Sequence, residues 1–325
     1  MIRMPDNKIG CSEYGHRAQG GSCNGIFLFL LGCLFFGSVQ ATDIPIGKVE
    51  HLYDIKEWST GKLALPTDVA VLADGRVCIV DSANHRVVVF SPIGDYLLDF
   101  GGVGTEKGQF KEPLGIGVDA KNNIYVADAG NNRIQVFDAK GQLKTSFPVK
   151  DRKGAVKPAD VAVSADGKTI YVTGNSNHKL MLFDARGKLL DVWGEEGASL
   201  GEFRYPATLV VHENDIYIVD VLNSRVQIFD PKGAARHKIG EWGVLPGQLF
   251  RPKGVAVDNR GWFYVTDSYM DVVQVFDNGY KFEHVLGTDQ ESWKFTAPTG
   301  LAIGKDNTLY VSEILENKVS VFKLH

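Results

Sequence analysis

Acidic residues followed five positions later by a basic residue recur along this chain, and they are the first candidates for chemistry. Asp128 with Arg133 and Asp220 with Arg225 are two examples, each after a run of apolar residues. One interpretation is a ring of charges that binds a polar ligand. The other is structural: each carboxylate caps its own turn and pairs with the basic residue of its unit. Because the pattern recurs in nearly every unit, we favour the structural role and look for function where the pattern breaks.

The pattern breaks in two units, and these two units and the one between them carry the candidate binding residues. Gly174 replaces the acid in one unit, and Val272 replaces the base in another. Aromatic, arginine and methionine side chains near these places suit a recognition surface, because such residues are enriched at protein interfaces. The predicted binding residues of these loops are His178, Arg204, Tyr205, Phe250, Arg251, Lys253, Tyr269 and Met270.

A metal site is the competing interpretation. Asp68 and Asp160 each begin a short apolar strand and could bind a ligand or supply oxygen ligands to a divalent cation. Alternatively, they accept hydrogen bonds from neighbouring backbone amides. His85 is the remaining metal candidate, but one imidazole falls short of the three protein ligands of a catalytic zinc. With no nucleophile elbow or phosphate-binding loop in the sequence, we predict no catalytic residues and no cofactor, and keep a channel cation as the less favoured alternative.

Regularly spaced prolines mark the period that positions these residues. After each proline come a short apolar strand, a turn rich in Asp, Asn or Gly, and further strands full of Val, Ile, Tyr and Phe. Four such strands per repeat are typical of a propeller blade. We therefore predict an all-β, six-bladed β-propeller of four-stranded antiparallel blades. The six prolines are Pro66, Pro113, Pro158, Pro206, Pro252 and Pro298.

The last repeat contains only three predicted strands, so its fourth strand must come from elsewhere. We expect residues 48–58 to pair with residues 319–322 and to close the ring. Closure of this kind covers an edge that would otherwise promote association. Small residues such as Gly117 and Ala162 at the third position of the first strands fit crowding near the axis.

Three segments resemble the NHL repeat: residues 108–115 (Gly-Gln-Phe-Lys-Glu-Pro-Leu-Gly), 124–128 and 131–137. The resemblance covers 60–323 and implies a six-bladed propeller. It does not decide function, because the family includes recognition domains, kinase sensor domains and amidating lyases. Those lyases carry a zinc-binding histidine directly after the proline of the first strand, and this chain has none at those positions. We therefore favour a non-catalytic binding, scaffold or sensor module; the alternative is a metal-dependent hydrolase or lyase, lactonase-like or amidating-lyase-like, at the channel mouth.

The first 41 residues differ in composition from the rest. A polar, slightly basic stretch precedes the apolar run 26–36, and small residues precede Thr42. This layout predicts a secretory signal peptide cleaved after Ala41, which leaves 42–325 as the propeller domain. Lipid attachment at Cys33 is less favoured. The apolar run is shorter than the roughly 20 residues that span a bilayer, so we expect a periplasmic or extracellular protein without a stable membrane span.

Charge and cysteine content narrow the class of partner. The formal net charge is −4, which gives no reason to expect nucleic acid as a partner. After signal cleavage only Cys78 remains, and its place in an alternating strand predicts a small buried hydrophobe rather than a disulfide. We expect the loops of one propeller face to bind a protein or a small polar ligand of the cell envelope.

Overall fold

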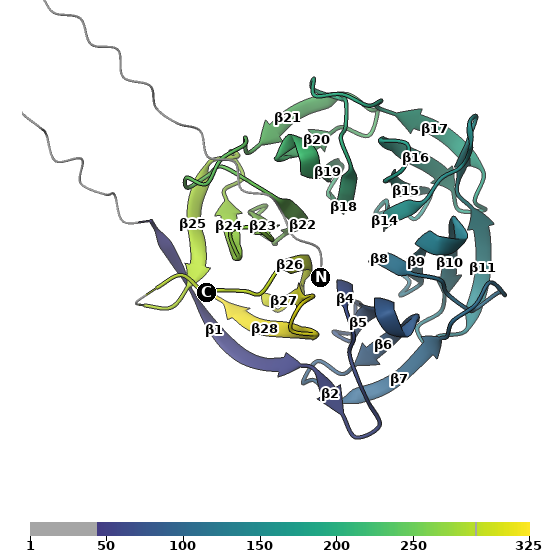
Figure 1. Ribbon diagram of the computed structural model, residues 1–325, viewed down its shortest axis with the longest axis horizontal. Helices are drawn as coiled ribbons and strands as arrows, with labels where there is room; N and C mark the ends of the chain where they lie inside the picture. The colour runs from purple at the N-terminus through teal and green to yellow at the C-terminus, as the bar shows by residue number, and fades with distance from the viewer. Residues whose placement is uncertain (1–43, 290) are drawn as a thin grey trace, which may run out of the picture. The chain divides into compact units, whose positions relative to one another are not determined.

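The computed structural model describes residues 44–289 and 291–325, and these form six blades around a central axis (Figure 1). The predicted signal peptide, its cleavage after Ala41 and the alternative at Cys33 lie outside the described residues. Blades one to three consist of β4 (Pro66–Val71), β5 (Val77–Asp81), β6 (Arg86–Phe90), β7 (Tyr96–Gly101); β8 (Pro113–Val118), β9 (Ile124–Asp128), β10 (Arg133–Phe137), β11 (Leu143–Pro148); β14 (Pro158–Val163), β15 (Thr169–Gly174), β16 (Lys179–Asp184), β17 (Leu189–Trp193).

Blades four to six continue the same order from the axis outward. They consist of β18 (Pro206–His212), β19 (Asp215–Asp220), β20 (Arg225–Phe229), β21 (Ala235–Ile239); β22 (Pro252–Val257), β23 (Phe263–Asp267), β24 (Val272–Phe276), β25 (Phe282–Gly287); β26 (Pro298–Ile303), β27 (Thr308–Glu313), β28 (Lys318–Leu324), β1 (Ile46–Ile55). Each inner strand contacts the inner strand of the next blade, and β26 contacts β4. The prediction of six antiparallel four-stranded blades is confirmed.

The repeat prolines stand where a strand can accept them. Each is the first residue of an inner strand, a position at which the missing N–H costs little. Small residues near the axis are also required, as expected. A Cβ on Gly117 would lie 2.2 Å from the carbonyl oxygen of Val161 in the next blade.

Apolar side chains fill the spaces between adjacent blades. Phe110 and Phe203 precede the prolines of blades two and four and are fully buried. Their rings lie 5.5 Å from those of Phe137 and Phe229, respectively. Cys78 is buried in the same way, and burial raises the pKa of its thiol to about 12. Its prediction as a small buried hydrophobe is therefore confirmed.

The N-terminal strand closes the ring. β1 pairs antiparallel with β28, from Val49 opposite Leu324 to Ile55 opposite Val319. The predicted pairing is confirmed, but the predicted segment was too long, because residues 57–58 leave the sheet and form a separate hairpin, β2 (Glu57–Trp58) with β3 (Gly61–Lys62). β1 also pairs in parallel with β25 of blade five, which was not predicted.

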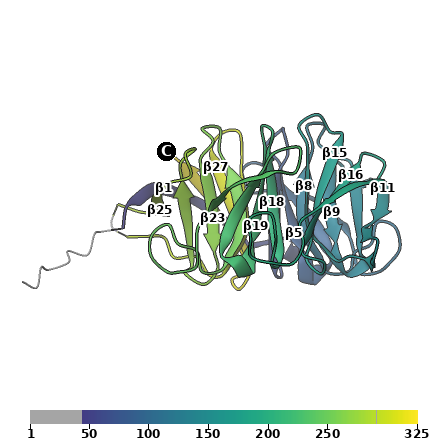
Figure 2. The ribbon, with the colours of Figure 1, turned by 90° about the horizontal axis from the view of Figure 1, so that it is seen from above.

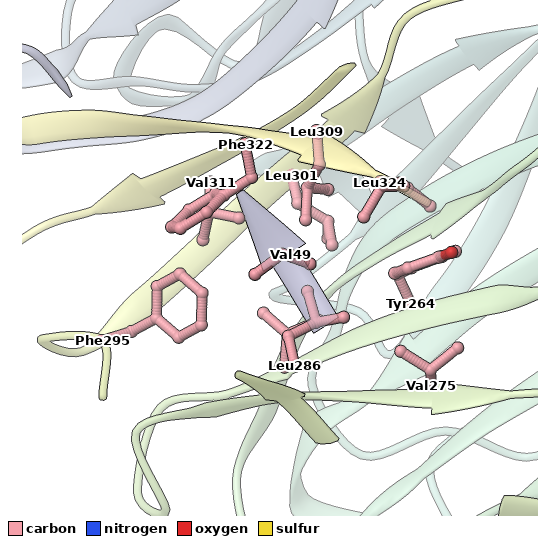
Figure 3. Close-up of a cluster of buried hydrophobic side chains, with 12 residues drawn as sticks. Val49, Tyr264, Val275, Leu286, Phe295, Leu301, Leu309, Val311, Phe322 and Leu324 are labelled. Atoms are coloured by element: carbon pink, nitrogen blue, oxygen red, sulfur yellow. The ribbon is translucent and has the colours of Figure 1, made fainter. Parts of the chain in front are cut away.

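This double pairing joins blades five and six into one eight-stranded sheet. Figure 3 shows Val49 of β1 lying between Leu286 of blade five and Phe322 and Leu324 of blade six. The closing strand therefore contributes to the apolar core between two blades as well as to backbone pairing.

The loops that carry the candidate residues lie at one end of the blades, which we call the loop face (Figure 2). This face contains the connections between the second and third strands and the connections that lead into the next inner strand, which we call entry loops. The two kinds of loop touch, since the Asn131 side chain donates to the Gly104 carbonyl at 3.0 Å. Within 44–289 and 291–325, no helix is long and apolar enough to cross a membrane.

Candidate functional site

The repeated acid–base pairs fasten loops together, as the structural interpretation predicted. In blade two the Asp128 carboxylate lies 2.6 Å from Nε of Arg133. The rest of that guanidinium donates to the carbonyls of Thr105, Glu106 and Gln109 in the entry loop, at 2.7–2.9 Å. Blade four repeats this arrangement. The charged groups of these residues already bind each other and the entry-loop carbonyls, so they are poor candidates for ligand binding.

Blade five holds the same loops without an arginine. Val272 stands where blade two has Arg133, and it has no group that could pair with the fully buried Asp267. The Phe250 amide donates to this carboxylate as its counterpart Lys111 does in blade two, and three further amides join it here, so that both loops bind one carboxylate. The amides that donate to Asp267 belong to Phe250 at 2.6 Å and to Arg251, Tyr269 and Met270 at 3.1 Å.

The replacement of arginine by valine coincides with a cavity. A space of about 260 Å³ lies beside Val272 and is bounded by Val244, Leu245, Pro246 and Met270. Val244 and Leu245 are the counterparts of the entry-loop residues whose carbonyls Arg133 binds in blade two. The blade-five cavity therefore lies where blades two and four place a guanidinium group.

Aromatic side chains stand next to this cavity. Phe250 and Tyr269 stack with ring centroids 4.0 Å apart, and Trp242 lies 5.9 Å from Phe250. Trp242 is 71% exposed, Leu245 63% and Tyr269 58%. Large neighbouring exposed apolar side chains of this kind mark interaction sites. We call the following residues the blade-five patch: Trp242, Val244, Leu245, Phe250, Tyr269 and Met270.

Three patch residues were missed from the sequence, namely Trp242, Val244 and Leu245. A comparison of entry loops could have found them. Both loops make the same backbone contacts: Gly104 N to Phe110 O and Gly243 N to Leu249 O, at 3.0 and 3.2 Å. The tip of the loop differs, with Thr-Glu-Lys at 105–107 in blade two and Val-Leu-Pro at 244–246 in blade five. The loop backbone therefore does not require apolar residues at its tip.

The predicted basic residues lie at the starts of blades four and five. Arg204 and Arg251 are exposed, Lys253 is half-buried, and none of the three forms an ion pair within the described chain. Burial and the neighbouring charge of Arg251 lower the pKa of Lys253. Their positions leave these cations available to a partner.

The two predicted histidines have a structural role in the loop face. Nδ1 of His178 accepts from the amide of Tyr205 at 3.1 Å, and Nδ1 of His85 accepts from the amide of Glu112 at 3.2 Å. Each ring thus links its blade to the next. His178 and Tyr205 lie at blades three and four as a second small cluster, apart from the blade-five stack.

Asp68 and Asp160 line the central channel, and both are buried. The alternative that they bind backbone amides is confirmed: Asp68 accepts from Ile116 and Asp160 from Leu209, both at 2.9 Å. The carboxyl groups interact with each other next to Gly115, where a Cβ would come 2.2 Å from Asp160. Neither carboxyl group forms an ion pair in the part of the chain that the structure describes. In the same part, no three His, Cys, Asp or Glu side chains are grouped to hold a metal.

This carboxyl pair predicts an unusual dependence of stability on pH. Burial raises the pKa of Asp68 to about 7, and burial together with the Asp68 charge raises the pKa of Asp160 well above its usual value. Because the folded pKa values exceed the unfolded ones, the pair supports folding fully at acidic pH and loses that contribution as the pH rises through about 7. We expect Asp68→Asn to flatten this loss and to unfold later than the wild type at pH 8, as measured by urea denaturation from pH 4 to 9.

The exposed Asp95 provides the control for this measurement. Asp95→Asn should leave the pH profile unchanged. If Asp68→Asn loses stability with pH as steeply as the wild type, the pair does not hold a proton in the folded state.

Family models and relatives agree with this architecture. The NHL repeat matches residues 63–90 and 110–137, and a family described as a 6-bladed beta-propeller matches 202–324. The RING finger protein nhl-1 of Caenorhabditis elegans is 38% identical over 70 residues, which is 22% of this chain and 7% of that protein.

Solved structures with the same fold share little sequence with this chain. A protein of unknown function from Bacteroides thetaiotaomicron has a TM-score of 0.66 at 17% identity, covering 86% of this chain and 75% of that one. A streptogramin B lyase has a TM-score of 0.57 at 15% sequence identity, covering 79% of this chain and 78% of that one. The hydrazine synthase of Kuenenia stuttgartiensis has a TM-score of 0.57 at 14% identity, covering 82% of this chain and 99% of that one. These likenesses show the fold alone. The repeat matches and the six blades together identify the chain as a six-bladed β-propeller that contains NHL repeats.

Proposed function

We propose that this propeller is an exported, non-catalytic scaffold or sensor module that binds a protein partner of the cell envelope through the blade-five patch. One observation carries the proposal: the tip of the blade-five entry loop is apolar and exposed, whereas the same loop in blade two is polar. Export rests on the signal-like composition of residues 1–41.

The patch has the properties of a protein-binding surface. Its aromatic members, Trp242, Phe250 and Tyr269, belong to residue types enriched at interface cores. The entry loop holds its own shape, since the amide of Gln248 donates to the Leu245 carbonyl at 2.8 Å and the amide of Leu245 to the Gln248 side chain at 3.1 Å. A preorganised loop loses little conformational freedom on binding, which favours affinity.

A metal-dependent hydrolase or lyase at the channel mouth is the second candidate. The buried pair of Asp68 and Asp160 favours it, because carboxylates are the ligands that hard cations prefer. Against it, the oxygens of both groups already accept backbone amides. Metal analysis of the purified protein separates the candidates, since one tightly held divalent ion per chain supports the enzyme.

Exchanging the loop tip tests the binding proposal. The triple variant Val244→Thr, Leu245→Glu, Pro246→Lys copies the tip of blade two and should fold normally, because blade two makes the same loop contacts with these residues. We expect it to lose the proteins that the wild type captures from a cell-envelope extract after cross-linking, as measured by quantitative mass spectrometry. Circular dichroism melting checks the fold.

Blade two also supplies the matched control. Glu106→Ala with Lys107→Ala alters the equivalent tip there and should leave capture unchanged. Equal capture by the wild type and the exchanged loop would show that the patch is not the binding surface.

A further inference from the structure

The blade-five cavity is suited to a single apolar side chain. Its volume of about 260 Å³ lies below the roughly 300–1,000 Å³ of sites for drug-sized ligands. Its walls include Val244, Leu245, Met270 and Val272, and among the described residues Lys294 is the one charged residue that lines it. A basic group in the cavity would be repelled by the positive charge of Lys294. It would also find no free carboxylate, because Asp267 already accepts hydrogen bonds from four backbone amides. An apolar group therefore fits this space better than a basic one.

One basic residue, Lys294, lines the cavity, and three others lie at the starts of blades four and five. Arg204, Arg251, Lys253 and Lys294 form no ion pair among the residues described, whereas arginines of blades one, two and four do. Arg251 stands where blade two has Glu112, which pairs with Lys157 at 3.1 Å. The charge at this position is thus reversed in blade five.

The acidic residues of the same loops accept hydrogen bonds from neutral amides and form no ion pair with these cations in the described chain. Glu241 accepts from the Gln248 side chain at 3.3 Å, and Asp271 accepts from the Ala297 amide at 3.1 Å. Arg251 and Lys253 repel each other, and part of this repulsion appears as the lowered pKa of Lys253. An anionic partner relieves such repulsion on binding. Because the whole chain has a formal charge of −4, these unpaired cations are a local feature.

We infer that the partner of the blade-five patch presents an apolar side chain flanked by acidic residues. The apolar side chain occupies the cavity between Leu245 and Val272, and the carboxylates pair with Arg251 and Lys253. This inference rests on the proposed function and specifies the chemistry of the partner.

A displayed library of random peptides, panned on the full-length protein, provides the probe. Enriched peptides should combine Leu, Ile, Met or Phe with nearby Asp or Glu. Their affinities, measured by fluorescence anisotropy, should fall roughly 10- to 100-fold for Val272→Arg and for Arg251→Glu, as is usual for hot-spot residues. Val272→Arg places the arginine of blades two and four in the cavity and should not lower the melting temperature.

Two further variants keep the test decisive. Leu245→Glu covers the case in which Val272→Arg does not fold, because blade two carries Glu106 at that position. Lys107→Glu, at the tip of blade two, should leave affinity unchanged. Enrichment of basic peptides overturns the inference, as does the absence of peptides sensitive to Val272→Arg or Leu245→Glu.

The envelope capture with the exchanged loop tip separates this inference from the proposed function. That experiment asks only whether the patch binds a protein. If capture depends on the tip while the library yields basic peptides, the proposed function stands and the acidic, apolar partner is wrong.

Discussion

Deleting residues 44–55 should make the protein associate and should lower its free energy of unfolding by several kcal/mol. The deletion removes β1, which pairs with β28 on one side and with β25 on the other. It also removes the buried side chains of Val49 and Ile55, each worth about 1.5–3 kcal/mol. Unpaired strand edges are templates for association with other chains. Sedimentation velocity measures the association, and urea denaturation measures the stability.

Point changes on β1 separate its two contributions. Val49→Asp keeps the backbone pairing and places a charge in the core between blades five and six, so it should destabilise without exposing an edge. Leu52→Ala is the matched control, because Leu52 is 42% exposed on the same strand and should cost little. A truncated protein that stays monomeric with the wild-type unfolding midpoint would show that β1 does not close the ring.

The second large effect is expected at Phe203, whose ring is fully buried at the start of blade four. Phe203→Ala should lower the free energy of unfolding by about 3–5 kcal/mol, the usual cost of truncating a buried phenylalanine to alanine. The neighbouring rings of Phe229 and Trp193, themselves stacked 6.2 Å apart, would have to collapse to reduce this cost. Urea denaturation with a two-state fit provides the number.

Tyr269→Ala is the informative comparison for this experiment. Tyr269 lies on the loop face and is largely exposed, so its removal should cost less than about 1 kcal/mol of stability and should weaken partner binding. Phe203→Ala should show the opposite combination, with binding retained wherever the protein remains folded. A loss below about 1 kcal/mol for Phe203→Ala would place that ring in solvent.

The fold was predictable because the same pattern of proline, turn and strand residues repeats six times in the sequence. Each copy has its proline at the first residue of an inner strand, and the strands after it are rich in β-branched and aromatic residues. The sixth copy lacks an outer strand, and this absence led to the prediction that the N-terminal segment supplies it. The parallel pairing of Ile46 with Val285 was not predictable, because such pairing leaves no local signature in the sequence.

The candidate site was predictable in part. The replacement of a basic residue by Val272 pointed to blade five, and Phe250, Tyr269 and Met270 do gather there. Sequence reasoning missed Trp242 because it considered the residues near the proline and not the tip of the entry loop. The binding role predicted for His178 stays a prediction; the sequence did not reveal that its ring accepts the amide of Tyr205, a contact that depends on how two blades pack.

The double pairing of β1 also sets the order in which the molecule can mature. Asp54 and Lys318 form an ion pair although they are 264 positions apart in the sequence. β1 can therefore pair with β28 only after nearly the whole chain has been synthesised. Contacts this distant in sequence form slowly. Ile44 and Val285, which lie beside this closure, also line the blade-five cavity. We therefore expect the blade-five cavity to gain its full lining only after β1 has paired with blades five and six.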